Sequence, residues 1–163
     1  MRKVRTSAAC VALAFAAVLF GATHRVAAQG RGAAATASGG FQVTFDGHMR
    51  TIEFTAQKDS SNNARGQGHL FNHVPGTKLH LEVDCLQVVG SVATISGKIS
   101  NTNTGAYPEE MPFWMQVIDR GEGAKAPADL TSSVRVFIGP GAACTDSVVP
   151  STYPIEGGNI QVR

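Results

Sequence analysis

Charged residues of either sign are scarce in this sequence. Asp, Glu, Lys and Arg make up 16% of the 163 residues, and the 14 basic residues nearly balance the 12 acidic ones. A protein that binds nucleic acid mainly through its phosphates needs a marked basic surplus. The charge balance therefore excludes a strongly basic nucleic-acid binder, and it equally excludes a long solvated acidic tail.

Catalytic and nucleotide-binding signatures are also absent. The sequence contains no G-x-S-x-G, no H-E-x-x-H, no Walker-type phosphate loop and no C-x-x-C. The glycine-containing stretch over residues 66–71 lacks the third glycine of a dinucleotide fingerprint, and it opens no helical pattern. None of these known catalytic constellations is therefore indicated.

The longest apolar run is short and lies at the N-terminus. It covers residues 8–22, about 15 residues against the roughly 20 that a helix needs to span a bilayer. Three basic residues within residues 2–5 precede it, and residues 26–28 (VAA) place small side chains at the −3 and −1 positions of a cleavage site. This order predicts a helical signal peptide over residues 1–28, and hence a secreted or periplasmic protein. An uncleaved membrane anchor is the alternative.

The chain that remains after cleavage is slightly acidic. Residues 1–28 contain four of the basic residues and no acidic one, so residues 29–163 carry ten basic and twelve acidic residues, a formal charge of −2. No second long apolar run follows, and we expect the mature form not to span a membrane.

Cysteine is equally scarce, with three residues in the whole chain. Cys10 falls within the predicted signal peptide, which leaves Cys85 and Cys144. In an oxidising compartment, such a pair is most simply one disulfide. It would close a loop of about 60 residues, which is worth about 4 kcal/mol in the chain-entropy model. Two free thiols are the alternative.

The mature sequence indicates one all-β domain. Residues 29–40 (QGRGAAATASGG) have no apolar face to bury and predict a flexible leader. From residue 41 to 163 no helical stripe occurs, whereas alternating apolar residues and frequent glycine favour short strands and tight turns. We therefore predict a small antiparallel sandwich or barrel of about seven to eight strands. The expected strands are 41–45, 52–56, 65–74, 78–89, 92–100, 113–118, 134–138 and 160–162.

Two hairpins follow from pairing arithmetic. Gly90 and Ser91 suit a two-residue type II′ turn, and the apolar phase slips near Cys85, which predicts a β-bulge around residues 84–86. The second hairpin turns at Pro75 and Gly76. A two-residue turn there would place His69 opposite Glu82 and Phe71 opposite His80, but a loop of four or more residues remains open.

Three sets of residues suggest chemistry. Asp119, Glu122 and Asp129 lie in a glycine-containing segment after an apolar strand, and oxygen ligands of this kind suit a weak Ca²⁺ site. The alternative is a solvated turn. In the short register His69, His80 and Glu82 form a second candidate cluster, against a plain polar sheet face. Trp114 with its neighbours suggests a carbohydrate platform, although a tryptophan within an apolar strand favours a core position.

Four motifs in this order resemble an uncharacterised family of small exported bacterial proteins. They are DCLQVVG at 84–90, A-T-x-x-G at 93–97, V-x-D-x-G-E-G at 117–123 and the C-terminal GGNIQVR at 157–163. The resemblance covers residues 40–163. It implies an exported all-β domain, sometimes attached to larger surface proteins, and it implies no reaction and no catalytic residue.

Two functions of different classes are compatible with these observations. The favoured one is a non-enzymatic extracellular or periplasmic binding or structural module for an envelope protein or a glycan, with loops 101–112 and 119–129 or the sheet edges as contact surfaces. The alternative is a metal-assisted hydrolase that uses either the acidic set or the histidine set described above.

Overall fold

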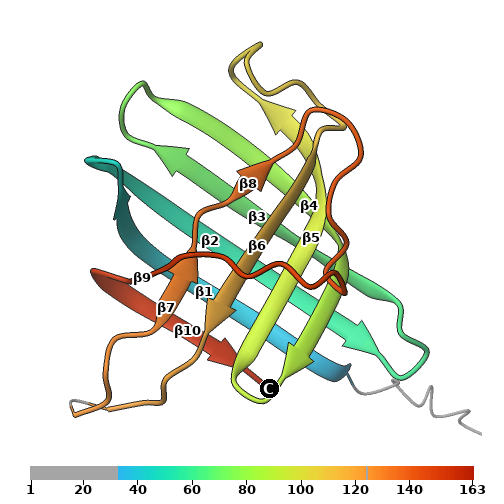
Figure 1. The fold of residues 1–163 in the computed structure, drawn as a ribbon, viewed down its shortest axis with the longest axis vertical. Coiled ribbons are helices and arrows are strands. Elements are labelled where there is room, and N and C mark those ends of the chain that lie inside the picture. Colours follow the sequence, from blue (N-terminus) through green and yellow to red (C-terminus); the bar gives the residue numbers. More distant parts are fainter. Residues whose placement is uncertain (1–32, 124) are drawn as a thin grey trace, which may run out of the picture. The chain divides into compact units, whose positions relative to one another are not determined.

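All strands belong to one antiparallel sheet. A computed structural model describes residues 33–123 and 125–163 of the chain. Nine of the ten strands in these residues follow one another in space as β10-β1-β2-β3-β4-β5-β6-β7-β9, and the tenth, β8, pairs with β6 (Figure 1). Their bounds are β1 Ala33–Phe45, β2 His48–Asp59, β3 Ala64–Asn72, β4 Thr77–Val89, β5 Val92–Thr102, β6 Pro112–Ile118, β7 Leu130–Ser132, β8 Arg135–Val136, β9 Thr152–Pro154 and β10 Gly157–Val162.

The sheet curls into a half-barrel, which confirms the all-β prediction and favours the barrel over the sandwich (Figure 1). In the described part of the chain no helix has the length and apolar character needed to cross a membrane. The predicted signal peptide and its helix lie outside the described residues.

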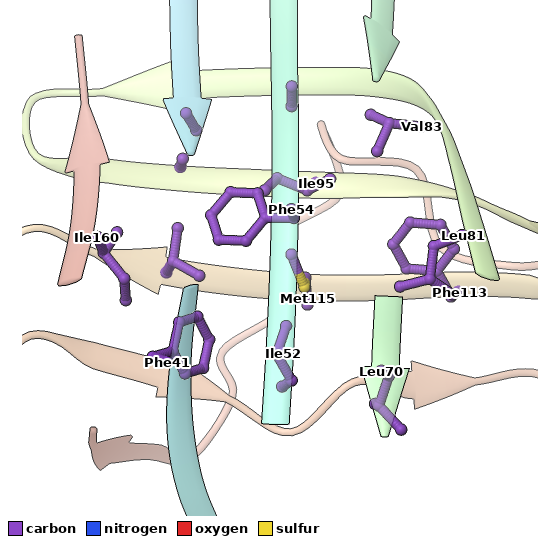
Figure 2. Close-up of a cluster of buried hydrophobic side chains, with 14 of the residues drawn as sticks. Phe41, Ile52, Phe54, Leu70, Leu81, Val83, Ile95, Phe113, Met115 and Ile160 are labelled. Atoms are coloured by element: carbon purple, nitrogen blue, oxygen red, sulfur yellow. The ribbon is translucent and has the colours of Figure 1, made fainter. Parts of the chain in front are cut away.

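The core fills the concave inner face of the half-barrel. Inward-pointing side chains alternate with outward-pointing ones along each long strand, and the largest of them, such as Ile52, Ile95 and Phe113, are 0% exposed. Figure 2 shows how side chains from β1, β2, β5, β6 and β10 converge there. A single apolar interior of this kind supplies the main favourable free energy of folding.

The flexible leader predicted over residues 29–40 is wrong from residue 33 onward. Residues 33–40 are the first half of β1, which is paired with β2 on one side and β10 on the other. Ala35 and Ala37 face the core at 9% and 1% exposure. A Cβ at Gly39 would approach Phe54 Cε1 and Asn159 O to 2.9 Å. The small side chains therefore reflect close packing rather than a solvated linker.

The predicted hairpin and bulge near Cys85 are confirmed. Val89 pairs with Val92 across the two-residue turn, and the register shifts between Val83 and Cys85. Gly90 has a φ of 59°, whereas Ser91 is not among the residues with positive φ, which is the pattern of a type II′ turn.

The hairpin between β3 and β4 has the longer loop. Asn72 pairs with Thr77, so four residues turn the chain, and His69 faces His80. Glu82 instead faces Gln67. The two-residue register, with His69 opposite Glu82 and Phe71 opposite His80, is therefore wrong.

Residues 137–151, here called the strap, cross the outer face of β5 and β6 (Figure 1). Cys144 in the strap is disulfide-bonded to Cys85 on β4, with Cα atoms 5.7 Å apart.

Cys85, Ser96 and Trp114 lie side by side in one row of this face. Trp114 is 0% exposed and is not a member of the main core cluster, because it points to the face opposite Phe113. The expectation that Trp114 is buried is confirmed, but it is buried on the face that the strap crosses and not in the main core.

Reduction of the disulfide should loosen the strap and expose the chain's single tryptophan, Trp114. The two cysteines are 59 residues apart, and the loss of this closed loop should lower the free energy of unfolding by about 4 kcal/mol. Denaturant unfolding and tryptophan emission, with and without a phosphine reductant, measure both effects. The Cys85→Ala/Cys144→Ala variant should match the reduced protein and ignore the reductant. An unchanged midpoint on reduction contradicts the prediction.

Candidate functional site

The three acidic residues predicted as calcium ligands contact β10. Asp119 Oδ2 accepts a hydrogen bond from the Val162 amide at 3.0 Å. Asp129 Oδ2 accepts one from the Ile160 amide at 2.9 Å. Glu122 Oε1 accepts a hydrogen bond from the Asn159 side-chain amide at 3.0 Å. The segment between β6 and β7 is thus fastened to the edge strand of the half-barrel.

The second oxygen of each aspartate organises its own loop. Asp119 Oδ1 accepts from the Gly121 amide at 2.8 Å, and Asp129 Oδ1 accepts from the Arg120 amide, also at 2.8 Å. Asp129 is only 5% exposed. Each oxygen of this buried carboxylate therefore accepts one backbone hydrogen bond.

Within residues 33–123 and 125–163, no group of three or more His, Cys, Asp or Glu side chains is arranged to hold a metal ion. The hydrogen bonds to β10 account for Asp119, Glu122 and Asp129 in the structure, and the Ca²⁺ site stays a prediction from sequence. Neither this set nor His69 with His80 and Glu82 forms such a group in the part of the chain that the structure describes.

The two histidines do meet on the outer face of the sheet. The ring centroids of His69 and His80 are 4.4 Å apart, in direct cross-strand positions. The neighbour of His69 on its other side is Glu53 of β2. Sequence reasoning missed Glu53, although its place in the alternating stretch 52–56 marks it as outward-facing. Glu82 lies farther along β4, where its carboxylate is 3.8 Å from Lys98 Nζ.

Outward-pointing side chains of β1–β4 form a surface that we call the bare face, because the strap crosses β5 and β6 instead. Three shallow hollows lie on it. The first has a volume of about 350 Å³ and an outward rim of Glu53, Thr55, Gln67 and His69. Its floor includes Gly40, where an added Cβ would meet nothing closer than Glu53 Cγ at 3.8 Å. A ligand can therefore approach the backbone closely here.

The other two hollows continue the first in both directions along β2. A hollow of about 250 Å³ shares Glu53 and His69 with it and reaches Thr51. A hollow of about 270 Å³ shares Thr55 and reaches Gln57. From residue 51 to residue 57 of a strand is about 20 Å. The three hollows therefore trace an elongated groove.

An aromatic group lies at the Thr51 end of this groove. The Phe71 ring is half-buried, with Lys78 Nζ 5.5 Å from its centroid and the His73 ring at 4.5 Å. His73 Nε2 is also 3.0 Å from the Thr51 hydroxyl. Phe71 thus presents a ring that its neighbours hold in place, next to several hydrogen-bonding side chains.

Charge on the bare face is nearly balanced. Glu53, Glu82 and Asp84 point outward from the same strands as Arg65 and Lys78. Partial burial of its carboxyl raises the pKa of Asp84, against a smaller opposing effect of a backbone hydrogen bond. On β5, the hydrogen bond to Glu110 raises the pKa of Lys98. The small acidic surplus is too weak to attract a highly charged polymer.

The loop over residues 101–112, a second predicted contact surface, is tied to the sheet. Asn103 Oδ1 accepts from the Lys78 amide at 2.7 Å, and Asn103 Nδ2 donates to the Gly76 carbonyl at 3.0 Å. Lys98 Nζ forms an ion pair with Glu110 at 3.0 Å. Tyr107 remains 39% exposed at the tip.

Comparisons of the chain with protein-family models, curated proteins and solved structures find no match.

Asp129→Asn should destabilise the protein by about 1–3 kcal/mol, because a carboxamide has one acceptor oxygen and leaves the Ile160 or Arg120 amide unsatisfied. Glu122→Gln is the matched control, and it should change stability by less than about 0.5 kcal/mol because Glu122 is exposed. Urea unfolding of both variants provides the measurement. Equal midpoints would show that the Asp129 hydrogen bonds do not hold β10.

Proposed function

We propose that this protein is an exported, non-enzymatic binding module that recognises a polysaccharide through the bare face of β1–β4. The observation that carries the proposal is the row of three hollows along β2, joined at Thr55 and at Glu53 with His69. A groove of about 20 Å suits an extended chain rather than one small molecule.

The side chains of the groove suit the chemistry of a sugar. Glu53, Gln67 and Thr55 offer acceptors and donors for hydroxyl groups, and all three are exposed. Phe71 and the paired imidazoles of His69 and His80 offer ring surfaces for the apolar faces of pyranose rings. The nearly balanced charge of this face favours a neutral or weakly charged polymer.

The strap supports the assignment of the binding surface to β1–β4. It crosses β5 and β6, where Ser96 and Trp114 are 5% and 0% exposed. The outward side chains of β2, β3 and β4 stay largely exposed, and the long strands beneath them have a full core on the other side. A rigid sheet with one uncovered face is a common platform for recognition.

Export is supported by the disulfide between Cys85 and Cys144, which is typical of oxidising compartments, and by the signal-peptide pattern over residues 1–28. When the full chain is expressed in a secreting bacterium, the mature protein should begin at Gln29. N-terminal sequencing and intact mass of the periplasmic and medium fractions measure this. Recovery of the uncleaved chain in the membrane fraction contradicts it.

The polysaccharide proposal predicts that the exported protein sediments with at least one insoluble polymer among cellulose, chitin and purified peptidoglycan. Glu53→Gln should weaken this binding at least about tenfold, because a hydrogen bond to a charged group contributes about 1.5–3 kcal/mol. Glu122→Gln makes the same chemical change on another surface and should leave the binding isotherm unchanged.

Two outcomes overturn the proposal. One is that none of the three polymers retains the protein, while purified envelope proteins capture it, which would assign the bare face to a protein partner. The other is that Glu122→Gln weakens binding as much as Glu53→Gln, which would show that the groove is not the contact surface.

A further inference from the structure

A separate hollow opens at the end of the half-barrel where β2 and β4 begin and β3 ends. Along these strands the inward-facing positions change from apolar to polar: Ile52, Leu70 and Leu79 give way to Arg50, Asn72 and Thr77. The hollow has a volume of about 230 Å³. Its apolar wall is made by Leu70, Leu79, Val134 and Val136, and Tyr107 and Ser133 complete its polar rim.

Arg50 at this rim is positioned but lacks a counter-ion. Its guanidinium carbon lies 5.0 Å from the centroid of the Phe45 ring, and Nη1 donates to Ser133 Oγ at 3.5 Å. The residue is half-buried. Both ion pairs found in residues 33–123 and 125–163 involve Lys98, so no described carboxylate lies within 4 Å of Arg50.

A half-buried guanidinium without a carboxylate partner is suited to bind an anion. Its planar fork of N–H donors matches a carboxylate, and stacking on an aromatic ring holds the fork before the ligand arrives. Partial burial strengthens the attraction, because less water screens the charge. Tyr107 adds a hydroxyl donor at the same rim, whereas the Ser133 hydroxyl accepts from Arg50 and donates to the Val134 carbonyl.

The apolar wall of the hollow indicates that the ligand also has an apolar part, and the volume of the hollow limits its size. Leu70 and Leu79 are 7% and 3% exposed, so they form a fixed floor rather than mobile surface groups. An apolar cavity of about 150 Å³ accepts benzene. By that scale, a hollow of about 230 Å³ accommodates roughly nine non-hydrogen atoms.

We propose that this hollow binds a small amphipathic carboxylate, with its anionic group on Arg50 and a short aliphatic chain against Leu70, Leu79, Val134 and Val136. This site is distinct from the polysaccharide groove, because the two share only Leu70 and Leu79 among their lining residues, and Arg50 lines the hollow alone. Either proposal can therefore fail without the other.

Isothermal titration of the protein purified after expression of the full chain tests the proposal with three probes. Octanoate carries both parts of the ligand, octanol only the chain and acetate only the charge. Octanoate should bind at a single site at least about tenfold more tightly than either of the others. Arg50→Gln should weaken octanoate at least about tenfold and leave octanol unchanged.

Arg65→Gln is the matched control, because it removes the same charge from the bare face, and it should leave octanoate binding unchanged. Val136→Phe tests the wall without altering charge, and it should weaken octanoate by filling the hollow. Amide chemical shifts of the unaltered protein provide a readout that depends on no variant. Octanoate should move Asn72, Thr77 and Ser133 and leave Gln67 in place.

The proposal is overturned if octanoate fails to saturate, or if octanol binds as tightly as octanoate. It is equally overturned if Arg65→Gln weakens octanoate as much as Arg50→Gln, or if the shifted amides map to the bare face.

Discussion

Two carboxylates join the edge strand β10 to the segments that flank β6 and β7. β10 pairs with β1 by an ordinary ladder, but its other side meets the opposite end of the sheet through Asp119 and Asp129. Each aspartate accepts a backbone N–H of β10 with one oxygen and a loop N–H with the other. An edge strand normally exposes a row of unpaired donors. Here side-chain oxygens satisfy two of them, so the sheet can close over its core without a continuous backbone ladder.

The closed sheet has an inner face, an open end where β2 and β4 begin, and an outer face with two parts. The inner face is filled with apolar side chains such as Ile52 and Ile95, and it becomes polar where the strands reach the open end at Arg50. On the outside, the strap covers β5 and β6, whereas β1–β4 stay bare. The disulfide from Cys144 to Cys85 anchors the strap at the boundary between the two halves. The surfaces available for recognition are therefore those that neither the core nor the strap requires.

The sequence pattern was sufficient where local rules decide the structure. The turn at Gly90, the bulge before Cys85 and the disulfide each follow from two or three nearby residues or from a count of cysteines. The sequence pattern was insufficient where contacts between segments far apart in the sequence decide the structure. The sequence of the first half of β1 resembles a linker, because it is rich in Ala and Gly. In the structure these small residues allow close packing against Phe54 and Ile160. Strands β7 and β9 have three residues each, too few for any alternation to be recognised. The hydrogen bonds from β10 to Asp119 and Asp129 were not foreseen, because that strand lies more than thirty residues later in the sequence.

The alternation of the strands also bears on whether the two proposed sites influence each other. Arg50 and Thr51 are adjacent in β2, yet one points into the open-end hollow and the other into the groove. Leu70 and His69 in β3 are related in the same way. Coupling between ligands requires an element that has two arrangements and that both sites bias. The strands between these faces carry a close-packed core, in which Ile52 is 0% exposed, and such a layer resists displacement. The two proposed binding surfaces should therefore act independently, although they lie on opposite sides of the same strands.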